Sequence, residues 1–255
     1  MRLNVISDVH GSVDTLARSA DGADGLICLG DLVLFLDYAD PAQGVFGELF
    51  GREPAAHFVA LRTEGRYQEA SAYASGLWDE LGGDRREHLD AKVRAQYAAM
   101  FAVMPEPAYL TYGNVDVPAY WSDYLRPGHR VLDGETVDIG GLRFGFVGGG
   151  LRSPMRTPYE LDDDVFAARV AALGEVDVLC SHIPPALPEL TYDTVARRFE
   201  RGSAALLEYI VDVGPKLALF GHVHQPLAQR TRVGRTECVN VGHFRGSGSP
   251  FSLQF

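Results

Sequence analysis

The sequence predicts an α/β fold in which helices cover layers of β-sheet. Short apolar runs rich in branched residues recur along the chain, and each ends abruptly in polar residues, as buried strands do. Segments with apolar residues at helical spacing separate several of these runs. The chain has 255 residues, of which 46% are hydrophobic and 22% charged, as in soluble globular proteins with one large domain or two small ones.

Five of the apolar runs are followed directly by residues that can bind metals or substrates. The runs and the residues after them are 3–6 with Asp8 and His10, 25–29 with Asp31, 109–112 with Asn114, 176–180 with His182, and 217–220 with His222 and His224. In layered α/β folds, ligands gather just beyond the carboxyl ends of the strands. We therefore expect these side chains to meet in one site.

The remaining elements follow from turn and cap signals. Further strands are predicted over 130–139, 142–147, 227–233 and 236–241, and glycine turns between them predict that this half is partly antiparallel. Helices are predicted over 12–20, with Ser12 as the N-cap, and over 162–173 and 193–211.

The segment 37–104 differs from the rest of the chain in its hydrophobic pattern. Its apolar and aromatic residues recur at helical spacing, and it contains no strand-like apolar runs. We interpret it as a helical insertion within a single domain that spans 1–255. The pattern leaves open whether the insertion covers a substrate pocket or forms an oligomer interface, and the oligomeric state is not predicted.

Composition restricts the function. The chain carries 23 basic and 34 acidic residues, which gives a net charge of −11. This charge argues against a protein whose main function is to bind the phosphate backbone of nucleic acid. A small anionic substrate stays possible, since bound metal ions add local positive charge. No apolar stretch approaches the roughly 20 residues of a membrane span. The three cysteines lie in or beside apolar runs, so we interpret them as buried thiols and expect a cytoplasmic protein.

Each polar cluster is weak when taken alone, but together they supply carboxylate or amide oxygens and four imidazoles. This set of donors suits two divalent transition ions. Two neighbouring ions need a ligand that binds both, and an isolated aspartate between two ligand groups is the natural candidate. Asp31 occupies this position in the sequence. No thiolate is at hand, which argues against a structural zinc cluster.

The motifs Asp8-x-His10, Gly30-Asp31, Gly113-Asn114, His182 and Gly221-His222-x-His224 occur in an order that resembles the calcineurin-like metallophosphoesterase family. The resemblance implies a four-layer αββα sandwich of two mixed β-sheets. Carried over motif by motif, it implies a first metal held by Asp8, His10, Asp31 and His224, and a second held by Asp31, Asn114, His182 and His222.

The implied activity is hydrolysis of a small phosphate ester by in-line attack of a hydroxide that bridges the two metals. The catalytic set that we expect is Asp31, Asn114 and Asp116. Manganese is our first expectation for both ions, and iron, zinc and nickel fit the same ligands.

The chain departs from the family at Val115. Many members have a histidine there, next to the asparagine, and that histidine is placed to protonate the leaving group. General acid help of this kind is worth about 10²–10⁴ in rate. We therefore favour phosphodiesters over phosphomonoesters as substrates. Asp116 and His243 are candidate substitute acids, and Arg152, after three glycines, is a candidate phosphate contact.

Three other functions stay open at this point. The chain could be a phosphomonoesterase of the same mechanism, a nuclease, or a metallophosphoesterase-like scaffold that binds a partner without catalysis. Lost catalysis should appear as substituted ligands, and every ligand position here holds a competent residue.

Overall fold

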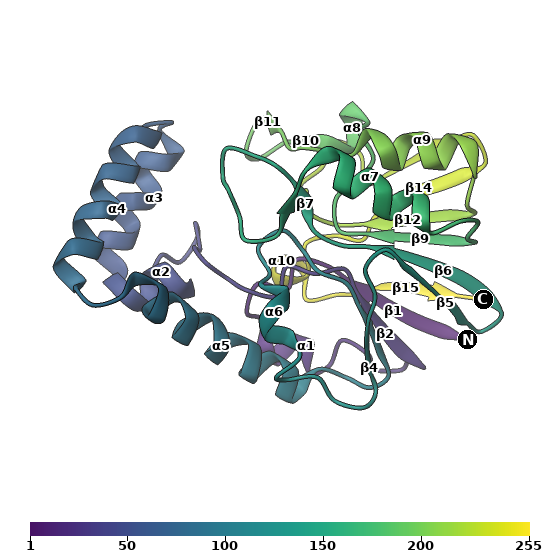
Figure 1. Cartoon of the computed structure of the whole chain (residues 1–255), viewed down its shortest axis with the longest axis horizontal. Helices are drawn as coiled ribbons and strands as arrows, with labels where there is room; N and C mark the ends of the chain where they lie inside the picture. The colour runs from purple at the N-terminus through teal and green to yellow at the C-terminus, as the bar shows by residue number, and fades with distance from the viewer. The chain divides into compact units, whose positions relative to one another are not determined.

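The computed structural model describes all residues, 1–255, and contains two large mixed β-sheets (Figure 1). The chain divides into two compact units. One comprises Met1–Leu32 and Met100–Phe255 and contains both sheets; the other is Val33–Ala99. The α/β class and the two mixed sheets that the sequence predicts are confirmed.

The first sheet has five strands in the order β15-β1-β2-β3-β4. Their bounds are β1 Arg2–Ile6, β2 Gly25–Cys28, β3 Ala108–Leu110, β4 His129–Val131 and β15 Phe251–Gln254. Strands β1 to β4 are parallel, and β15 pairs antiparallel with β1. The carboxyl ends of β1, β2 and β3 therefore lie at the same edge of the sheet.

The second sheet has six strands in the order β13-β14-β12-β9-β6-β5. Their bounds are β5 Glu135–Ile139, β6 Leu142–Val147, β9 Val178–Ser181, β12 Leu217–Phe220, β13 Arg230–Val233 and β14 Thr236–Asn240. The central strands β6, β9, β12 and β14 are parallel, and the outer strands β5 and β13 are antiparallel to their neighbours. The carboxyl ends of β9 and β12 share one edge in the same way.

Apolar side chains from both sheets form one continuous core. Leu3 and Ile27 from the first sheet belong to the same buried cluster as Phe144, Leu219 and Val239 from the second. The two sheets thus pack face to face, as in sandwich folds whose inner side chains interdigitate.

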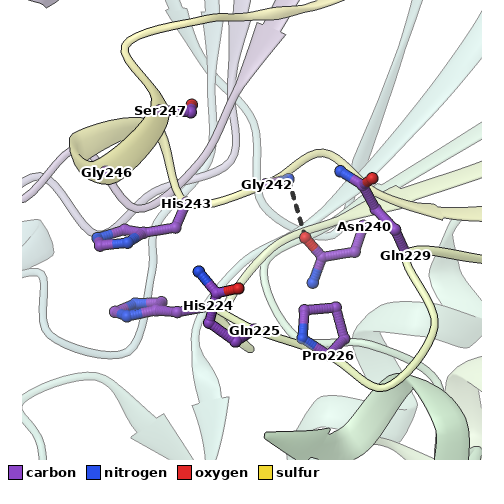
Figure 2. A pocket seen from close by; sticks show the side chains of 9 residues that line it. All are labelled: His224, Gln225, Pro226, Gln229, Asn240, Gly242, His243, Gly246 and Ser247. Atoms are coloured by element: carbon purple, nitrogen blue, oxygen red, sulfur yellow. Dashed lines mark hydrogen bonds between the residues drawn. The ribbon is translucent and has the colours of Figure 1, made fainter. Parts of the chain in front are cut away.

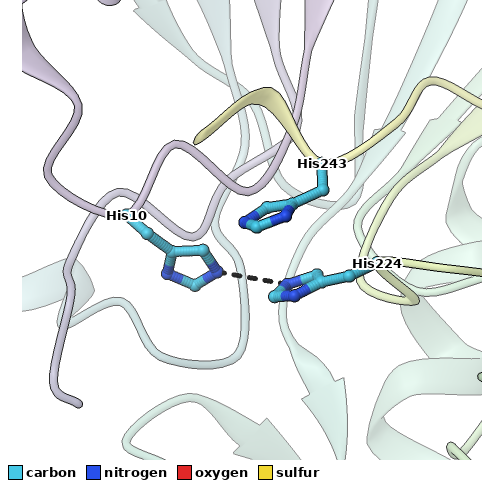
Figure 3. Close-up of side chains that lie close together, drawn as sticks. All are labelled: His10, His224 and His243. Atoms are coloured by element: carbon cyan, nitrogen blue, oxygen red, sulfur yellow. Dashed lines mark hydrogen bonds between the residues drawn. The ribbon is translucent and has the colours of Figure 1, made fainter. Parts of the chain in front are cut away.

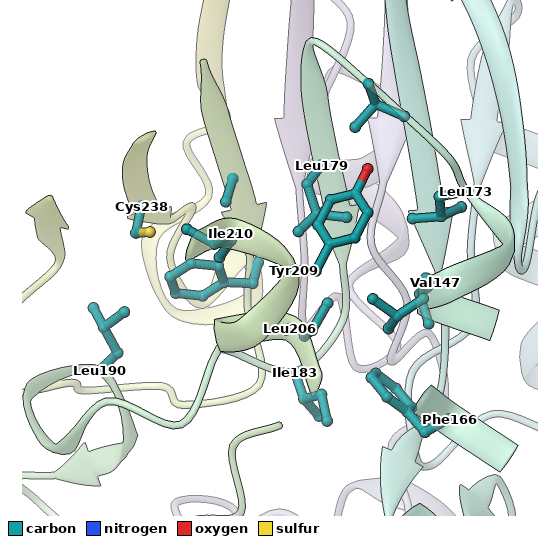
Figure 4. Close-up of a cluster of buried hydrophobic side chains, with 14 of the residues drawn as sticks. Val147, Phe166, Leu173, Leu179, Ile183, Leu190, Leu206, Tyr209, Ile210 and Cys238 are labelled. Carbon is teal, nitrogen blue, oxygen red and sulfur yellow. The ribbon is translucent and has the colours of Figure 1, made fainter. Parts of the chain in front are cut away.

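Helices α7 (Asp163–Ala172) and α9 (Ala204–Asp212) cover the outer face of the second sheet. Phe166 from α7 and Leu206 from α9 pack with Leu179 of β9 in a second buried cluster, shown in Figure 4. Ser203 caps α9, because its hydroxyl accepts a hydrogen bond from the Leu206 N–H at 3.2 Å. This layer fixes strand β9, which leads into His182.

Four short helices and two small strand ladders complete this unit. The helices are α1 Val13–Leu16, α6 Pro118–Trp121, α8 Pro188–Thr191 and α10 Phe244–Ser247, and the ladders are β7 Gly150–Leu151 with β8 Glu160–Leu161 and β10 Tyr192–Asp193 with β11 Arg198–Phe199.

The second unit, Val33–Ala99, is helical. It contains α2 Gly44–Phe50, α3 Arg52–Thr63, α4 Tyr67–Leu81 and most of α5 Arg85–Val103. Its aromatic residues pack on one another: the Phe46 ring stacks on Phe58 at 4.4 Å, and Phe50 meets Trp78 edge to face at 4.8 Å. The sequence predicts a helical insertion over 37–104, whereas the end of α5 belongs to the unit with the sheets.

Two predicted elements are wrong in their extent because of local backbone geometry. The single strand over 130–139 is two strands in different sheets, β4 and β5, separated by a turn in which Gly134 has φ +73°. The long helix over 193–211 is replaced by the β10–β11 ladder and then by the shorter α9. Asp193 accepts hydrogen bonds from the N–H groups of Val195 and Ala196, and this side-chain turn competes with the helix.

The other boundaries differ less. The helix over 12–20 is only α1, and Ser12 makes no capping bond through its side chain. The strand over 227–233 begins at Arg230, and β15 was not predicted. The three cysteines are free and buried, as predicted, and burial raises the pKa of Cys28 to about 12. None of the ten helices combines the length and hydropathy that a membrane crossing requires.

Candidate dinuclear metal centre

The five strand ends that the sequence singles out converge in the structure. Loops after β1, β2 and β3 of the first sheet meet loops after β9 and β12 of the second. They bring together Asp8, His10, Asp31, Asn114, His182, His222 and His224, which the sequence scatters over more than two hundred positions.

A first group of side chains surrounds Asp8. His224 Nε2 lies 3.4 Å from Asp8 Oδ1 and 3.4 Å from His10 Nε2. His10 Nε2 lies 3.9 Å from Asp8 Oδ1 and 3.9 Å from Asp31 Oδ2. The side chains that the resemblance assigns to one metal therefore direct their donor atoms at one another.

A second group surrounds His182. Its Nε2 lies 3.0 Å from Asn114 Oδ1 and 3.4 Å from Asp31 Oδ2. His222 joins the group, since one donor atom each from Asp31, His182 and His222 lie within 4.8 Å of one another. His222 and His224, two residues apart in one loop, thus belong to different groups.

Asp31 lies between the two groups. Its Oδ2 is the carboxylate oxygen near both His10 and His182, while its Oδ1 accepts a hydrogen bond from the Val115 N–H at 3.0 Å. This hydrogen bond fixes the carboxylate orientation and leaves Oδ2 directed at both groups, which is the geometry that a bridging ligand needs.

The backbone around these side chains is strained. Asp8, His10, Asp31 and His222 all have positive φ, between 42° and 67°. Residues other than glycine seldom adopt this region, and each such residue costs on the order of 1–3 kcal/mol. The surrounding structure holds the strain, since the His10 N–H donates to Asp31 O and the Asp8 N–H to Gly30 O.

Glycines allow the ligand loops to approach closely. A Cβ atom at Gly113 would lie 1.9 Å from Asp31 Oδ1, and one at Gly30 would lie 1.9 Å from the Gly113 nitrogen. A Cβ at Gly221 would lie 2.4 Å from Asp8 Oδ2. The Gly-Asp, Gly-Asn and Gly-His pairs of the sequence are therefore steric requirements of the site.

Neighbouring groups orient the ligand side chains. The His182 Nδ1–H donates to the Leu29 carbonyl at 2.8 Å, which leaves Nε2 free to bind a cation. The Asn114 amide donates through Nδ2 to Thr157 Oγ1 at 3.0 Å, so its Oδ1 faces the site. Asp8 Oδ2 accepts the His222 N–H at 2.9 Å.

The titration behaviour of these groups reflects their burial together. Burial opposes ionisation of Asp8 and Asp31, but facing imidazolium groups outweigh it and hold the pKa of both carboxyls below the ordinary value. Burial also opposes protonation of His182, yet the Asp31 carboxylate raises its pKa to about 9. Burial and nearby His182 lower the pKa of His222 to about 4. The site thus keeps two buried anions, which suit a cation.

Asp116 lies directly behind the site. It is fully buried, and its carboxylate accepts hydrogen bonds from the N–H groups of Asp31 and Gly113 at 2.8 Å and of Leu32 at 3.0 Å. Burial, with the charge of Asp31, raises the pKa of Asp116 to about 7. The carboxylate ties the β2 and β3 loops together.

Arg152 and His243 differ in their placement. The Arg152 side chain is exposed and forms an ion pair with Asp162 at 2.8 Å, and no contact brings it to the ligand groups. His243 stacks on His224 with ring centroids 3.9 Å apart and planes nearly parallel, and it lies edge-on to His10, as Figure 3 shows. Its Nε2 is buried without a hydrogen-bond partner.

Two structural supports of the site were not predicted from the sequence. The Asn240 amide donates to the carbonyls of Gly221 and Val223, and so holds the loop between His222 and His224. Arg245 donates from Nη1 to the His10 carbonyl at 2.8 Å. Asn240 lies inside the strand predicted over 236–241 and is the last residue of β14, and Arg245 lies in no recognisable motif, so neither carried the signal of the ligands.

The donor set fits two divalent cations. Each group offers nitrogen and oxygen donors within one ion's reach, the carboxylate between them is shared, and the partners of His182 and Asn114 turn the binding atoms inward. The same donor set suits manganese, iron, zinc and nickel.

Comparison with known proteins gives the family of the chain. The calcineurin-like phosphoesterase family profile matches residues 1–226, so the chain belongs to that family. Membership supports a metal-dependent phosphoesterase. No curated protein sequence matches the chain.

Solved structures resemble it in fold. One crystal structure superposes with a TM-score of 0.57 at 14% identity over 95% of this chain and 91% of the other. The protein TT1561 of Thermus thermophilus superposes with a TM-score of 0.53 at 14% identity, over 99% of this chain and 98% of its own. At such identities the likeness concerns the fold alone.

Proposed function

We propose that this chain is a dinuclear metal hydrolase that prefers phosphodiesters. Asp8, His10 and His224 would hold one ion; Asn114, His182 and His222 would hold the other, with Asp31 shared by both. Two bound cations supply Lewis-acid charge at the phosphoryl oxygens and lower the pKa of water enough to provide a nucleophile near neutral pH.

The residues of the chain contribute orientation and charge balance. Asp8 and Asp31 bring two buried negative charges, and Asn114 adds a neutral oxygen donor, which limits repulsion of an anionic phosphate. The hydrogen bonds from Val115 to Asp31 and from His182 to Leu29 hold the donors before any substrate arrives. Such preorganisation supports catalysis because nothing needs to reorder during the reaction.

The observation that carries the diester preference is Val115. Its N–H is used by Asp31, and its half-buried side chain can neither donate a proton nor form a hydrogen bond. Of the other expected groups, Asp116 accepts three backbone N–H groups and Arg152 pairs with Asp162. His243 alone is uncommitted, because it stacks on His224 with no hydrogen-bond partner for its Nε2. Without the histidine that many members of the family have next to the asparagine, hydrolysis depends more on how readily the leaving group departs.

Comparison of methyl 4-nitrophenyl phosphate with 4-nitrophenyl phosphate, in the presence of added Mn²⁺, tests the preference with one leaving group. We expect kcat/KM for the diester to exceed that for the monoester by about tenfold or more. A strong monoester preference would identify a phosphomonoesterase of the same mechanism. Absence of turnover from a protein that retains its metals would identify a binding scaffold.

The role of Val115 is tested by a series of aryl methyl phosphates with phenols of rising pKa. We expect log kcat to fall steeply along the series for the wild type. Val115→His should flatten the fall by restoring a proton donor, whereas Val115→Leu, of similar character, should leave it steep. Equal slopes in all three proteins would remove the basis of the proposal.

Three further parts of the function are proposals. Manganese is the metal that we propose first, and metal analysis of protein purified without added metal decides among the four candidates. A small ester rather than nucleic acid is the proposed substrate, in view of the net charge of −11. A reducing cytoplasmic compartment is proposed because all three cysteines are free.

A further inference from the structure

A pocket of about 410 Å³ adjoins the candidate metal centre. It is lined by His224, Gln225, Pro226, Gln229, Asn240, Gly242, His243, Gly246 and Ser247. Figure 2 shows the stacked rings of His224 and His243 on one side and Gln229 and Asn240 on the other. The volume lies in the usual range of small-molecule sites, about 300–1,000 Å³.

The pocket and the candidate metal centre share one wall, which is formed by His224. His224 is a candidate ligand, and its Nε2 lies 3.4 Å from both Asp8 and His10. A phosphate ester at the metals would therefore extend one of its organic groups along the His224 and His243 rings into the pocket.

The lining selects the chemistry of that group. It contains no Lys, Arg, Asp or Glu, and its only ionisable side chains are His224, which is assigned to a metal, and His243 stacked on it. An uncharged group therefore fits this lining better than a second phosphate or an ammonium group. The Asn240 amide is engaged by the carbonyls of Gly221 and Val223 and the N–H of Gly242. Gln225 and Gln229 remain, with exposed side chains that can both donate and accept hydrogen bonds.

The two glutamines are held in place through their backbones. The Gln225 carbonyl accepts from the Thr194 N–H at 2.8 Å, and its N–H donates to Asp193 at 3.3 Å. The Gln229 carbonyl accepts from the Asn240 N–H at 2.9 Å. Their backbones are therefore fixed at the pocket, and their exposed side chains line it.

We propose that this pocket binds an uncharged, hydroxylated organic group of the substrate, such as a nucleoside or sugar, and that Gln225 and Gln229 determine this specificity. The inference rests on the proposed function and names the substrate class of the same site.

Four 4-nitrophenyl phosphodiesters test the pocket, with methyl, butyl, thymidine 5′ and glucose 6 groups as the second ester. We expect kcat/KM for the thymidine or the glucose ester to exceed that for the methyl ester by about tenfold, and the butyl ester to gain little. The better of the two distinguishes a nucleoside from a sugar.

Variants locate the effect. Gln225→Ala and Gln229→Ala should each reduce the preference over the methyl ester about 3- to 10-fold, mainly through KM, as expected for loss of one neutral hydrogen bond. Gln68→Ala, an exposed change on α4, is the matched control and should leave the preference unchanged. Metal content should stay the same in all three.

Binding of thymidine 5′-monophosphate or glucose 6-phosphate by calorimetry gives a readout without turnover, and the double variant Gln225→Ala/Gln229→Ala should weaken the binding of the favoured ligand. Equal rates for all four diesters, or equal binding of both ligands by wild type and double variant, would overturn the pocket proposal while the phosphodiesterase proposal stands. Absence of turnover with retained, glutamine-dependent binding would overturn the phosphodiesterase and leave the pocket.

Discussion

At the scale of single residues, the candidate centre depends as much on side chains that are absent as on those that are present. Gly113 has no Cβ, so Asp31 Oδ1 can lie where that atom would be, and Gly221 gives the same freedom to Asp8 Oδ2. A ligand follows each of these glycines directly, Asn114 after Gly113 and His222 after Gly221. The Gly-Asn and Gly-His pairs of the sequence are thus explained by short contact distances in the folded chain. Propensity scales for secondary structure do not include such contacts.

Replacement of Gly113 by alanine should disturb Asp31 directly. The added methyl group must displace a carboxylate held from several sides, and overpacking of this kind costs about 1–3 kcal/mol. We expect lower stability to urea and a loss of bound metal. Gly76→Ala is the control, because nothing lies within 4 Å of its Cβ position on α4 and alanine favours the helix. Full metal retention by Gly113→Ala would contradict the crowding argument.

Asp116 is expected to act on the metal centre only through backbone positions. In Asp116→Asn, one orientation of the amide opposes the N–H groups of Asp31 and Gly113, and the other opposes that of Leu32. An unmade hydrogen bond to a buried donor costs about 1–3 kcal/mol.

We expect Asp116→Asn to lower both the free energy of unfolding measured in urea and the affinity for metal. Asp138→Asn, an exposed change on β5, should alter neither quantity. A pH–rate profile separates the roles further. If Asp116 only positions the loops, the profile of the remaining activity keeps its shape; loss of one limb would restore Asp116 as the acid.

At the scale of elements, the C-terminal turn α10 is bound to the first ligand loop. The Phe244 N–H donates to Ser7 O, the Arg245 N–H to Asp8 O, and the Arg245 side chain to His10 O. The turn thus braces a strained segment in which Asp8 and His10 have positive φ. A segment more than two hundred residues away contributes to the shape of the first ligand group.

Arg245→Ala should therefore weaken Mn²⁺ binding roughly tenfold, the effect of about 1.4 kcal/mol, since it removes a charged donor from the His10 carbonyl. Calorimetric titration of the metal-free protein measures this change. Arg232→Ala, exposed on β13, serves as the control and should bind Mn²⁺ as the wild type does. Equal affinities for both variants would show that α10 does not support the site.

Across the whole molecule, the sequence predicts strands and their ends better than it predicts loops. Runs such as 25–29 are unambiguous because burial on both faces requires continuous apolar residues. The helix predicted from Asp193 fails because the same residue type caps helices and closes turns, and only the tertiary contact of Asp193 with the Gln225 N–H favours the turn.

The ligand set was accessible because each member follows a strand. Asn240 carried no such signal because it lies inside the strand predicted over 236–241, and the role of Arg245 depends on a contact with residues at the opposite end of the chain. The fold supplies this contact by placing β15 beside β1.

Bound metals should also stabilise the whole fold. A ligand present at about 100 times its Kd adds about 2.7 kcal/mol to the free energy of unfolding. For a chain of this size, we expect EDTA to lower Tm by about 5–10 °C and excess Mn²⁺ to restore it. An unchanged Tm after chelation would mean that the folded chain has no specific metal site.

The most direct measurement is anomalous diffraction from crystals grown with Mn²⁺, combined with metal analysis in solution. The account predicts two ions per chain, one on each side of Asp31 and both bound by its carboxylate. In Asp31→Asn crystals we expect at least one of the two peaks to vanish. A single ion, two ions without Asp31 between them, or histidines turned away from any peak would contradict the central claim.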